Sequence, residues 1–129
     1  MRVNGEKIDI DYEKTRAFFD SREEKYTEEH PYVTTMYQDK QPHLTDARNQ
    51  AEIDKILPLL ELDPNAQILD VGCGVGRWAD AIPCNVAGYL GIDFSEGLVQ
   101  IARSRNQKSS FIFETMSVCD FGKYFRSHK

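Results

Sequence analysis

The sequence has few cysteines and no long apolar run, and each absence excludes a class of protein. Its 129 residues include only 3 cysteines, with no Cys-x-x-Cys pair and no neighbouring pair of histidines. Such an odd, sparse set argues against a disulfide framework and against a zinc site. No stretch approaches the ~18 apolar residues of a membrane span, and the first residues do not resemble a signal peptide. We therefore expect a cytoplasmic protein without a bound metal.

A concentration of basic charge is also lacking. The formal net charge is −5. Residues 1–63 carry fifteen acidic side chains against nine basic ones, and residues 64–129 carry six against seven. Nucleic-acid-binding proteins usually present a basic stripe or patch, so nucleic acid is not an expected partner. The hydrophobic content of 40% and the charged content of 29% are ordinary for a globular domain.

The most informative stretch is a short apolar run, residues 68–71, followed by three glycines at alternate positions. The run fits a buried strand of a parallel sheet. Glycine backbones at Gly72, Gly74 and Gly76 allow a tight turn and let a ligand touch the main chain. A helix can begin at Arg77, and its first N–H groups carry a partial positive charge. The pattern predicts a nucleotide site built from a strand, a glycine turn and a helix.

Two carboxylates flank this stretch at the ends of predicted strands. Asp70 comes directly before the first glycine, and Asp93 ends a second apolar run that begins at Val86. An acidic residue at the end of the second strand accepts hydrogen bonds from ribose hydroxyls in dinucleotide folds. The segments Leu-Asp-Val-Gly-Cys-Gly-Val-Gly and Gly-Ile-Asp-Phe-Ser resemble the class I S-adenosylmethionine-dependent methyltransferases. The resemblance covers about residues 45–121.

The resemblance implies roles for the residues of these two segments. The glycine turn, including Cys73, would hold the methionine end of S-adenosyl-L-methionine. Asp70 would orient the turn and the amino group of the cofactor. Asp93 would bind the ribose, and Phe94 would lie against the adenine. Cys73 itself is interpreted as a small residue that fits the turn rather than as a reactive thiol.

Two other parts of the chain resemble cofactor-contacting segments of the family. After the third strand the family commonly has an aspartate that holds the adenine amino group. Ser117 aligns to that place, so the main chain of Met116 and Ser117 would contact the adenine, with Asp120 as the alternative. Near the N-terminus, the aromatic-x-x-Arg…Tyr pattern suggests that Arg22 and Tyr26 belong to a lid over the cofactor.

The remaining pattern predicts an α/β fold with three parallel strands, ordered 3-2-1 by right-handed crossovers. A helix capped by Asp9 or Asp11 should run to Pro31, followed by an irregular connection. We also expect an amphipathic helix capped by Thr45 or Asp46 and kinked at Pro58. Its apolar side would consist of Leu44, Ala47, Ala51, Ile53, Ile56, Leu57 and Leu60. A helix from Ser95 to Arg105, a strand over 110–116 and a polar tail would follow. Residues 1–43 would form an N-terminal helical lid segment, and residues 44–129 a partial Rossmann-like domain that binds S-adenosylmethionine.

In the resembling family the sheet has seven strands, and a fourth strand pairs with the free side of the first. This sequence contains no counterpart of it, so we expect an incomplete fold from a truncated chain. The strand at residues 68–71 would then be an exposed edge, open to self-association or to a partner chain.

The expected function is methyl transfer from S-adenosyl-L-methionine to a small-molecule acceptor by in-line displacement. No catalytic residue is identified, since the pattern pairs neither His30 nor His43 with a partner. One alternative is a cofactor-binding fragment or pseudoenzyme without turnover. Another is an NAD(P)-binding oxidoreductase domain, because residues 74–79 also satisfy G-x-G-x-x-A. Asp70 beside the charged end of the ligand would repel a pyrophosphate, whereas it suits a cationic amine or sulfonium.

Overall fold

The computed structural model describes residues 11–36, 40–83 and 85–127 of the chain. Three strands, β1 (Gln67–Val71), β2 (Gly88–Asp93) and β3 (Phe111–Thr115), form a parallel sheet in the order β1-β2-β3. This confirms the predicted α/β fold class and strand order, although β2 begins two residues after the predicted Val86. Within the described residues β1 pairs with β2 alone, so its other edge carries no strand.

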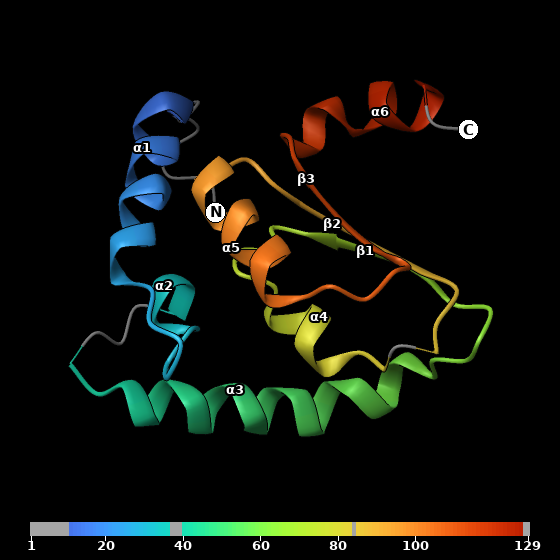
Figure 1. Ribbon diagram of the computed structural model, residues 1–129, viewed down its shortest axis with the longest axis horizontal. Helices are drawn as coiled ribbons and strands as arrows, with labels where there is room; N and C mark the ends of the chain where they lie inside the picture. Colours follow the sequence, from blue (N-terminus) through green and yellow to red (C-terminus); the bar gives the residue numbers. More distant parts are fainter. Residues whose placement is uncertain (1–10, 37–39, 84, 128–129) are drawn as a thin grey trace, which may run out of the picture.

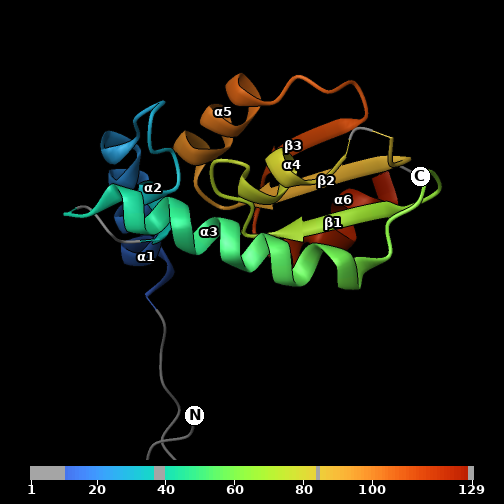
Figure 2. The ribbon, with the colours of Figure 1, turned by 90° about the horizontal axis from the view of Figure 1, so that it is seen from below.

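The helices lie on both sides of this sheet and at one end of it (Figure 1). They are α1 (Tyr12–Arg22), α2 (Val33–Met36), α3 (Pro42–Ile56), α4 (Arg77–Ala81), α5 (Glu96–Arg105) and α6 (Phe121–Ser127), with 3₁₀ turns η1 (Glu23–Lys25), η2 (Leu57–Leu60) and η3 (Val118–Asp120). In Figure 1 α4 and α5 lie beside the sheet, and α3 runs along the bottom of the molecule. Figure 2 shows β1 pointing toward the end where α1 and α2 lie. The carboxyl end of β1 therefore faces the N-terminal helices.

One face of the sheet forms the core with α4 and α5. Tyr89 stacks on Phe111 with ring centroids 4.8 Å apart, and both rings are buried. Gly91 leaves room for them, because a Cβ there would lie 3.0 Å from atoms of Cys73, Phe113 and Tyr89. The cluster also holds Ala79, Ile82, Val86, Val99 and Ala102. These residues pack α4, which follows the turn after β1, and α5, which follows the loop after β2, against the sheet.

The opposite face carries an apolar row that is largely open. Leu69, Leu90 and Ile112 lie opposite one another across the three strands. Leu69 is 44% exposed and Ile112 is 50% exposed. No helix in the described part of the chain is long and apolar enough to span a membrane.

Two of the predicted helix starts agree with the structure. Asp11 caps α1 by accepting a hydrogen bond from Lys14 N at 3.0 Å, whereas Asp9 lies outside the described residues. Ser95 caps α5 by accepting one from Leu98 N at 3.4 Å. For α3 the predicted caps were wrong. Both lie inside the helix, which begins at Pro42, because proline is well tolerated in a first helical turn.

Other local predictions were also wrong. The first helix does not reach Pro31 but ends in η1, and α2 occupies part of the predicted irregular connection. At Pro58 the chain does not kink within an α-helix; it passes into η2, which ends at Glu61 with φ 48°. The predicted polar tail contains α6. The predicted division of the chain near residue 43 stays a prediction.

The inward side of α3 also differs from the prediction. Thr45, Asn49 and Ile53 are its buried residues, whereas Leu44 and Ile56 are exposed. Of the two inward polar residues, Asn49 accepts a hydrogen bond from Arg77 Nη1 at 3.0 Å. The buried hydroxyl of Thr45 has no hydrogen-bond partner among the described residues. A polar contact with α4 thus orients this helix.

Candidate functional site

The turn after β1 depends on glycine at three positions. Gly72, Gly74 and Gly76 have φ values of 74°, 54° and 90°, in the left-handed region that side chains disfavour. A Cβ at Gly74 would lie 2.9 Å from Thr35 Cγ2, so α2 packs closely on the turn. At Gly72 a Cβ would meet nothing within 4 Å, so the main chain there is open to a ligand.

Hydrogen bonds tie this turn to the end of β2. Gly72 N and Cys73 N both donate to Ile92 O, at 2.8 and 3.0 Å. Gly74 N donates to Asp93 Oδ2 at 3.0 Å. Asp70 was expected to orient the turn, but the side chain that bonds to it is Asp93. The reason is topological, since β2 lies beside β1 and its last residue reaches the turn.

Asp93 is buried, with 8% of its surface exposed. Its second carboxylate oxygen, Oδ1, accepts a hydrogen bond from Ser95 N at 2.9 Å. Burial raises the pKa of Asp93, the main-chain donors Ser95 and Gly74 oppose that rise, and the nearby carboxylate of Asp20 adds to it. Asp93 is therefore a preorganised acceptor at the carboxyl end of β2.

Asp70 accepts a hydrogen bond from the Tyr89 hydroxyl at 2.6 Å. Burial raises the pKa of Asp70, whereas the Tyr89 hydrogen bond and the Arg77 guanidinium lower it. The thiol of Cys73 is also buried, and burial together with the carboxylates of Asp93 and Asp70 raises its pKa. This agrees with the interpretation of Cys73 as an unreactive part of the turn.

Two hollows open at the carboxyl ends of the strands. The polar hollow, of about 340 Å³, is lined by Thr35, Met36, Asp70, Val71, Gly72, Cys73, Gly74, Arg77 and Trp78. The apolar hollow, of about 240 Å³, is lined by Tyr12, Thr15, Val71, Gly72, Ile92, Asp93, Phe94, Met116, Ser117 and Val118. Because both include Val71 and Gly72, they meet at the start of the glycine turn. The two adjoining hollows together are called the cleft. Asp70 lines its polar hollow, and Asp93 lines its apolar hollow.

The structure brings most of the predicted site residues to this cleft. Eight of them line it: Asp70, Gly72, Cys73, Gly74, Asp93, Phe94, Met116 and Ser117. Gly76 lies in the interior, where a Cβ would be 3.6 Å from Ala102 Cβ. Arg22 and Tyr26 line neither hollow. The Arg22 guanidinium instead donates to Thr34 O at 2.9 Å and to Val33 O at 2.7 Å. The cofactor contacts of Gly76, Arg22 and Tyr26 stay predictions.

The alternative between Ser117 and Asp120 stays open. Ser117 Oγ caps η3 by accepting a hydrogen bond from Cys119 N at 3.2 Å. Asp120 lines a third, more polar hollow that borders the apolar one. Met116, Ser117 and Phe94 line both. Both residues thus line a hollow that Phe94 also lines.

Several residues of the site were missed at the level of the sequence. Tyr12 and Thr15 reach the apolar hollow from α1, and Thr35 and Met36 reach the polar hollow from α2. The spacing of Tyr12 and Thr15 on one helical face was a usable signal; α2 gave none.

His30 has a partner that the sequence pattern did not reveal. Its Nδ1 lies 2.5 Å from Asp46 Oδ2. The partner belongs to α3, sixteen residues further along the chain. A pairing between two segments so far apart in the sequence leaves no local pattern.

Comparison with known proteins agrees with this geometry. A family model described as a methyltransferase domain matches residues 68–126. The match supports the predicted family, the class I S-adenosylmethionine-dependent methyltransferases, and the predicted enzyme class. The cofactor of that family is S-adenosyl-L-methionine.

Individual relatives match only part of their own length. A 23S rRNA (uracil(1939)-C(5))-methyltransferase of Polaromonas naphthalenivorans is 29% identical over 94 residues, which cover 70% of this chain and 18% of that protein. Phosphoethanolamine N-methyltransferase 1 of Haemonchus contortus, solved with phosphoethanolamine and S-adenosylhomocysteine, has a TM-score of 0.62 at 19% identity, covering 84% of this chain and 22% of that one. A methyltransferase of Anabaena variabilis has a TM-score of 0.52 at 16% identity, covering 87% and 42%. The chain therefore spans about a fifth of the first two and less than half of the third.

Proposed function

We propose that the cleft binds S-adenosyl-L-methionine and that the domain transfers its methyl group to a small-molecule acceptor. The observation that carries this proposal is the continuity of the polar and apolar hollows across Gly72, with Asp70 in one and Asp93 in the other. A ligand with a charged amino-acid end and a flat nucleoside end matches such a cleft.

The residues present fit each part of that ligand. The Asp70 carboxylate suits the cationic amino group, and the exposed main chain at Gly72 allows close approach. Asp93 Oδ1 and Oδ2 can accept from the ribose hydroxyls in addition to their two main-chain donors, because each carboxylate oxygen accepts more than one bond. The ring of Phe94, edge-on to Phe19 at 5.7 Å, offers an apolar surface to the adenine.

Chemically, the cofactor supplies an activated methyl on a sulfonium, and the protein aligns the acceptor and excludes water. The residues that would line the acceptor's approach are those of α1 and α2 at the mouth of the cleft. No acid or base is assigned.

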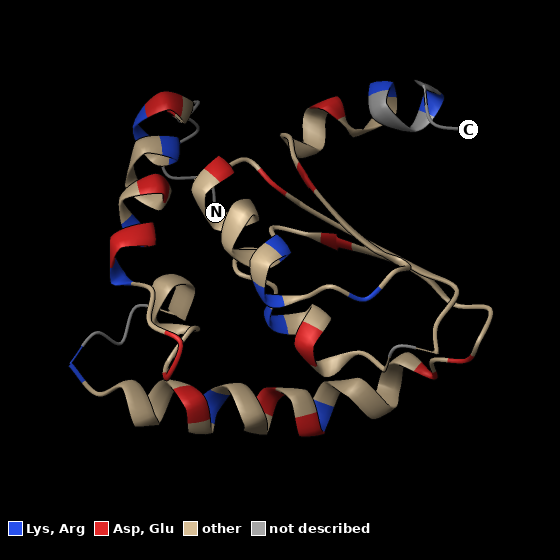
Figure 3. Ribbon diagram, in the orientation of Figure 1, with Lys and Arg blue, Asp and Glu red and all other residues tan. Residues whose placement is uncertain are grey.

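Charge distribution supports a small-molecule acceptor. Figure 3 shows acidic and basic residues interleaved along α1 and α3, with no continuous basic stripe over the described elements. The net charge of −5 points the same way. A relative acts on ribosomal RNA, so RNA is the competing acceptor class. Weak, salt-insensitive retention on RNA would support the small-molecule proposal, and tight, salt-dependent binding would contradict it.

For a protein partner, we propose a second copy of the chain at the open side of β1. The unpaired edge of β1 adjoins the apolar row and a further apolar hollow lined by Ile56, Leu60, Ile68, Leu69, Asp70, Trp78 and Ile82. Such edges promote strand pairing between chains. Sedimentation velocity should show a concentration-dependent dimer that Leu69→Lys converts to monomer; a monomer at all concentrations would contradict the proposal.

Calorimetric titration with S-adenosylhomocysteine, with NAD as the parallel ligand, tests the cofactor proposal. Saturable binding of S-adenosylhomocysteine alone is the expected result. Binding of NAD alone would support the oxidoreductase alternative. Binding of S-adenosylhomocysteine without methyl transfer to any acceptor would support the alternative of a cofactor-binding pseudoenzyme.

The affinity should also depend on pH through Asp70. Its pKa is raised in the folded chain, so as the pH falls through that value Asp70 takes up a proton and loses its attraction for the ligand's amino group. The same protonation stabilises the unliganded fold, since the burial cost of the charge disappears. Affinity should therefore reach a plateau at pH values above the raised pKa of Asp70 and fall by up to about tenfold per pH unit below it. Calorimetric titrations of wild type across this pH range should show the loss of affinity that the uptake of one proton produces. Asp70→Asn should not show that pH dependence.

A further inference from the structure

A compact polar cluster connects α5, α4 and α2 behind the glycine turn. Arg105 Nη1 donates to Val75 O at 2.7 Å, and Val75 is the residue between Gly74 and Gly76. The same guanidinium donates from Nη2 to Asp80 Oδ2 at 2.6 Å. The Arg105 guanidinium therefore binds the main chain of the turn and forms an ion pair with the Asp80 carboxylate of α4.

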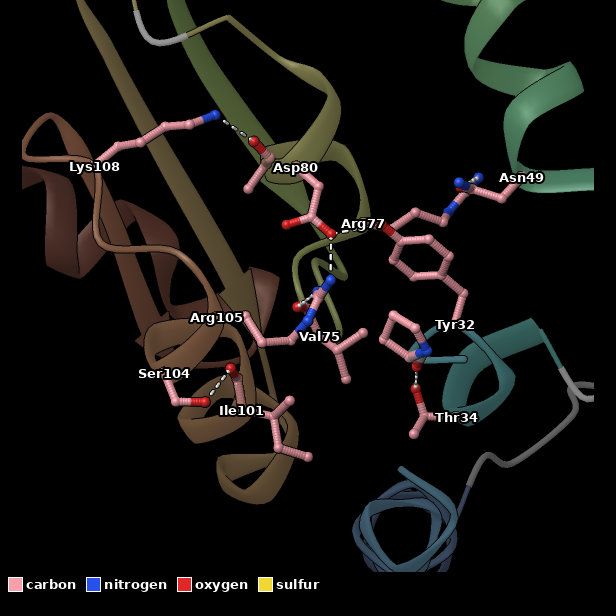
Figure 4. Close-up of polar contacts among 12 residues, drawn as sticks. Tyr32, Thr34, Asn49, Val75, Arg77, Asp80, Ile101, Ser104, Arg105 and Lys108 are labelled. Carbon is pink, nitrogen blue, oxygen red and sulfur yellow. Dashed lines mark hydrogen bonds and ion pairs between the residues drawn. The ribbon is translucent and has the colours of Figure 1, made fainter. Parts of the chain in front are cut away.

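Tyr32 completes this cluster from the N-terminal segment. Its hydroxyl donates to Asp80 Oδ2 at 2.5 Å, and its ring lies 5.4 Å from the Arg105 guanidinium carbon. Figure 4 shows Asp80 between Arg105 and the ring of Tyr32. Residues 48 and 25 positions from Asp80 thus converge on one carboxylate oxygen. The contact links the residue before α2 to α4 and α5.

The position of α2 matters because it forms one wall of the polar hollow. Thr35 and Met36 line that hollow with Gly72 and Gly74. Thr35 also packs on the turn, because a Cβ at Gly74 would lie 2.9 Å from its Cγ2. The apolar hollow is lined by neither Thr35 nor Met36 and receives Tyr12 and Thr15 from α1 instead. Through α2 the cluster is therefore coupled to the polar hollow.

We propose that Tyr32, Asp80 and Arg105 are positioning residues that hold α2 and the glycine turn in register, and so set affinity for the amino-acid end of the cofactor. The proposal rests on the proposed function. It assigns these three residues an indirect role, since none of them lines either hollow. The Tyr32 hydroxyl, which is uncharged, attaches α2 to the ion pair of Asp80 and Arg105. Because neither charged residue lines the cleft, the pair adds no charge to it.

The test compares two ligands that differ in their amino-acid end. S-adenosylhomocysteine has that end, whereas 5′-methylthioadenosine lacks it and keeps the nucleoside. Tyr32→Phe removes the hydroxyl and leaves the ring over Arg105. It should weaken S-adenosylhomocysteine about tenfold, the scale of one hydrogen bond to a charged group, and leave 5′-methylthioadenosine within about twofold of wild type. Arg105→Lys should reproduce this pattern, because a single ammonium cannot match the two-pronged guanidinium.

Ser104→Ala is the matched control. Its hydroxyl donates only within α5, to Ile101 O at 2.8 Å, among the described contacts, and it is exposed. This variant should bind both ligands as wild type does. Equal weakening of both ligands by Tyr32→Phe would indicate a general structural role and overturn the proposal, as would unchanged affinity for both. Wild type that binds 5′-methylthioadenosine but not S-adenosylhomocysteine would also overturn it, and wild type that binds neither would overturn the proposed function itself.

Discussion

Replacing Asp93 with alanine should abolish measurable binding of S-adenosylhomocysteine and lower the midpoint of thermal unfolding. The substitution removes the acceptor for two main-chain donors, Gly74 N and Ser95 N. A buried donor left without a partner costs about 1–3 kcal/mol. Removing the carboxylate also removes the unfavourable burial of its charge, which raises the pKa of Asp93. We therefore expect the free energy of unfolding to fall by about 1–3 kcal/mol, which is less than the summed cost of two unpaired donors. Calorimetry and a thermal melt measure the two effects.

Asp54→Ala is the control for this variant. Asp54 is an exposed carboxylate on α3 that accepts a hydrogen bond from Gln50 at 2.7 Å. Its loss should change stability by less than about 0.5 kcal/mol and leave affinity unchanged. Asp93→Asn keeps one carbonyl oxygen and should fall between alanine and wild type. Wild-type affinity in Asp93→Ala would show that the ribose is held elsewhere.

Gly74→Ala should destabilise the domain more than Gly72→Ala. Both positions have left-handed φ values, which cost a non-glycine residue about 1–2 kcal/mol. At Gly74 the added methyl also meets Thr35 Cγ2 at 2.9 Å, whereas at Gly72 it meets nothing within 4 Å. The clash must displace α2 or the turn, so affinity for S-adenosylhomocysteine should drop more than tenfold, a loss of about 1.4 kcal/mol or more.

The difference between the two glycine variants isolates the contact with α2. Chemical denaturation gives the free energy of unfolding for each. Gly122→Ala in α6 serves as a reference without strain or clash, because its added methyl meets nothing within 4 Å and its φ is not positive. It should stabilise the chain by up to about 1 kcal/mol. Equal destabilisation at Gly72 and Gly74 would show that α2 yields without cost and that the packing of Thr35 on the turn is unimportant.

The sequence specified the sheet and the turn because their signals are local. An apolar run, alternating glycines and a terminal carboxylate are all readable within a few residues, and the cap at Ser95 follows the same rule. The bond from Gly74 N to Asp93 was not predictable in the same way, since it depends on the alignment of β1 with β2. The inward side of α3 was misjudged because Asn49 is buried by a contact with Arg77, which overrides the apolar pattern of the helix. The contact between His30 and Asp46 was missed for a similar reason, because two side chains sixteen positions apart on different segments leave no periodic pattern.

The bonds around the glycine turn have a consequence for the order in which the site can form. The residues outside the turn that hydrogen-bond to it all come later in the chain: Ile92, Asp93 and Arg105. Lys108, which donates to Ala79 O and Ile82 O at 3.0 and 2.8 Å, extends this dependence to α4. During synthesis, which proceeds from the N-terminus, a nascent chain that has emerged only as far as residue 90 contains the whole glycine motif and none of these partners. The motif should therefore stay unable to bind the cofactor on the ribosome until at least residue 108 has left the exit tunnel, so that cofactor binding reports the arrival of β2 and α5 at the turn.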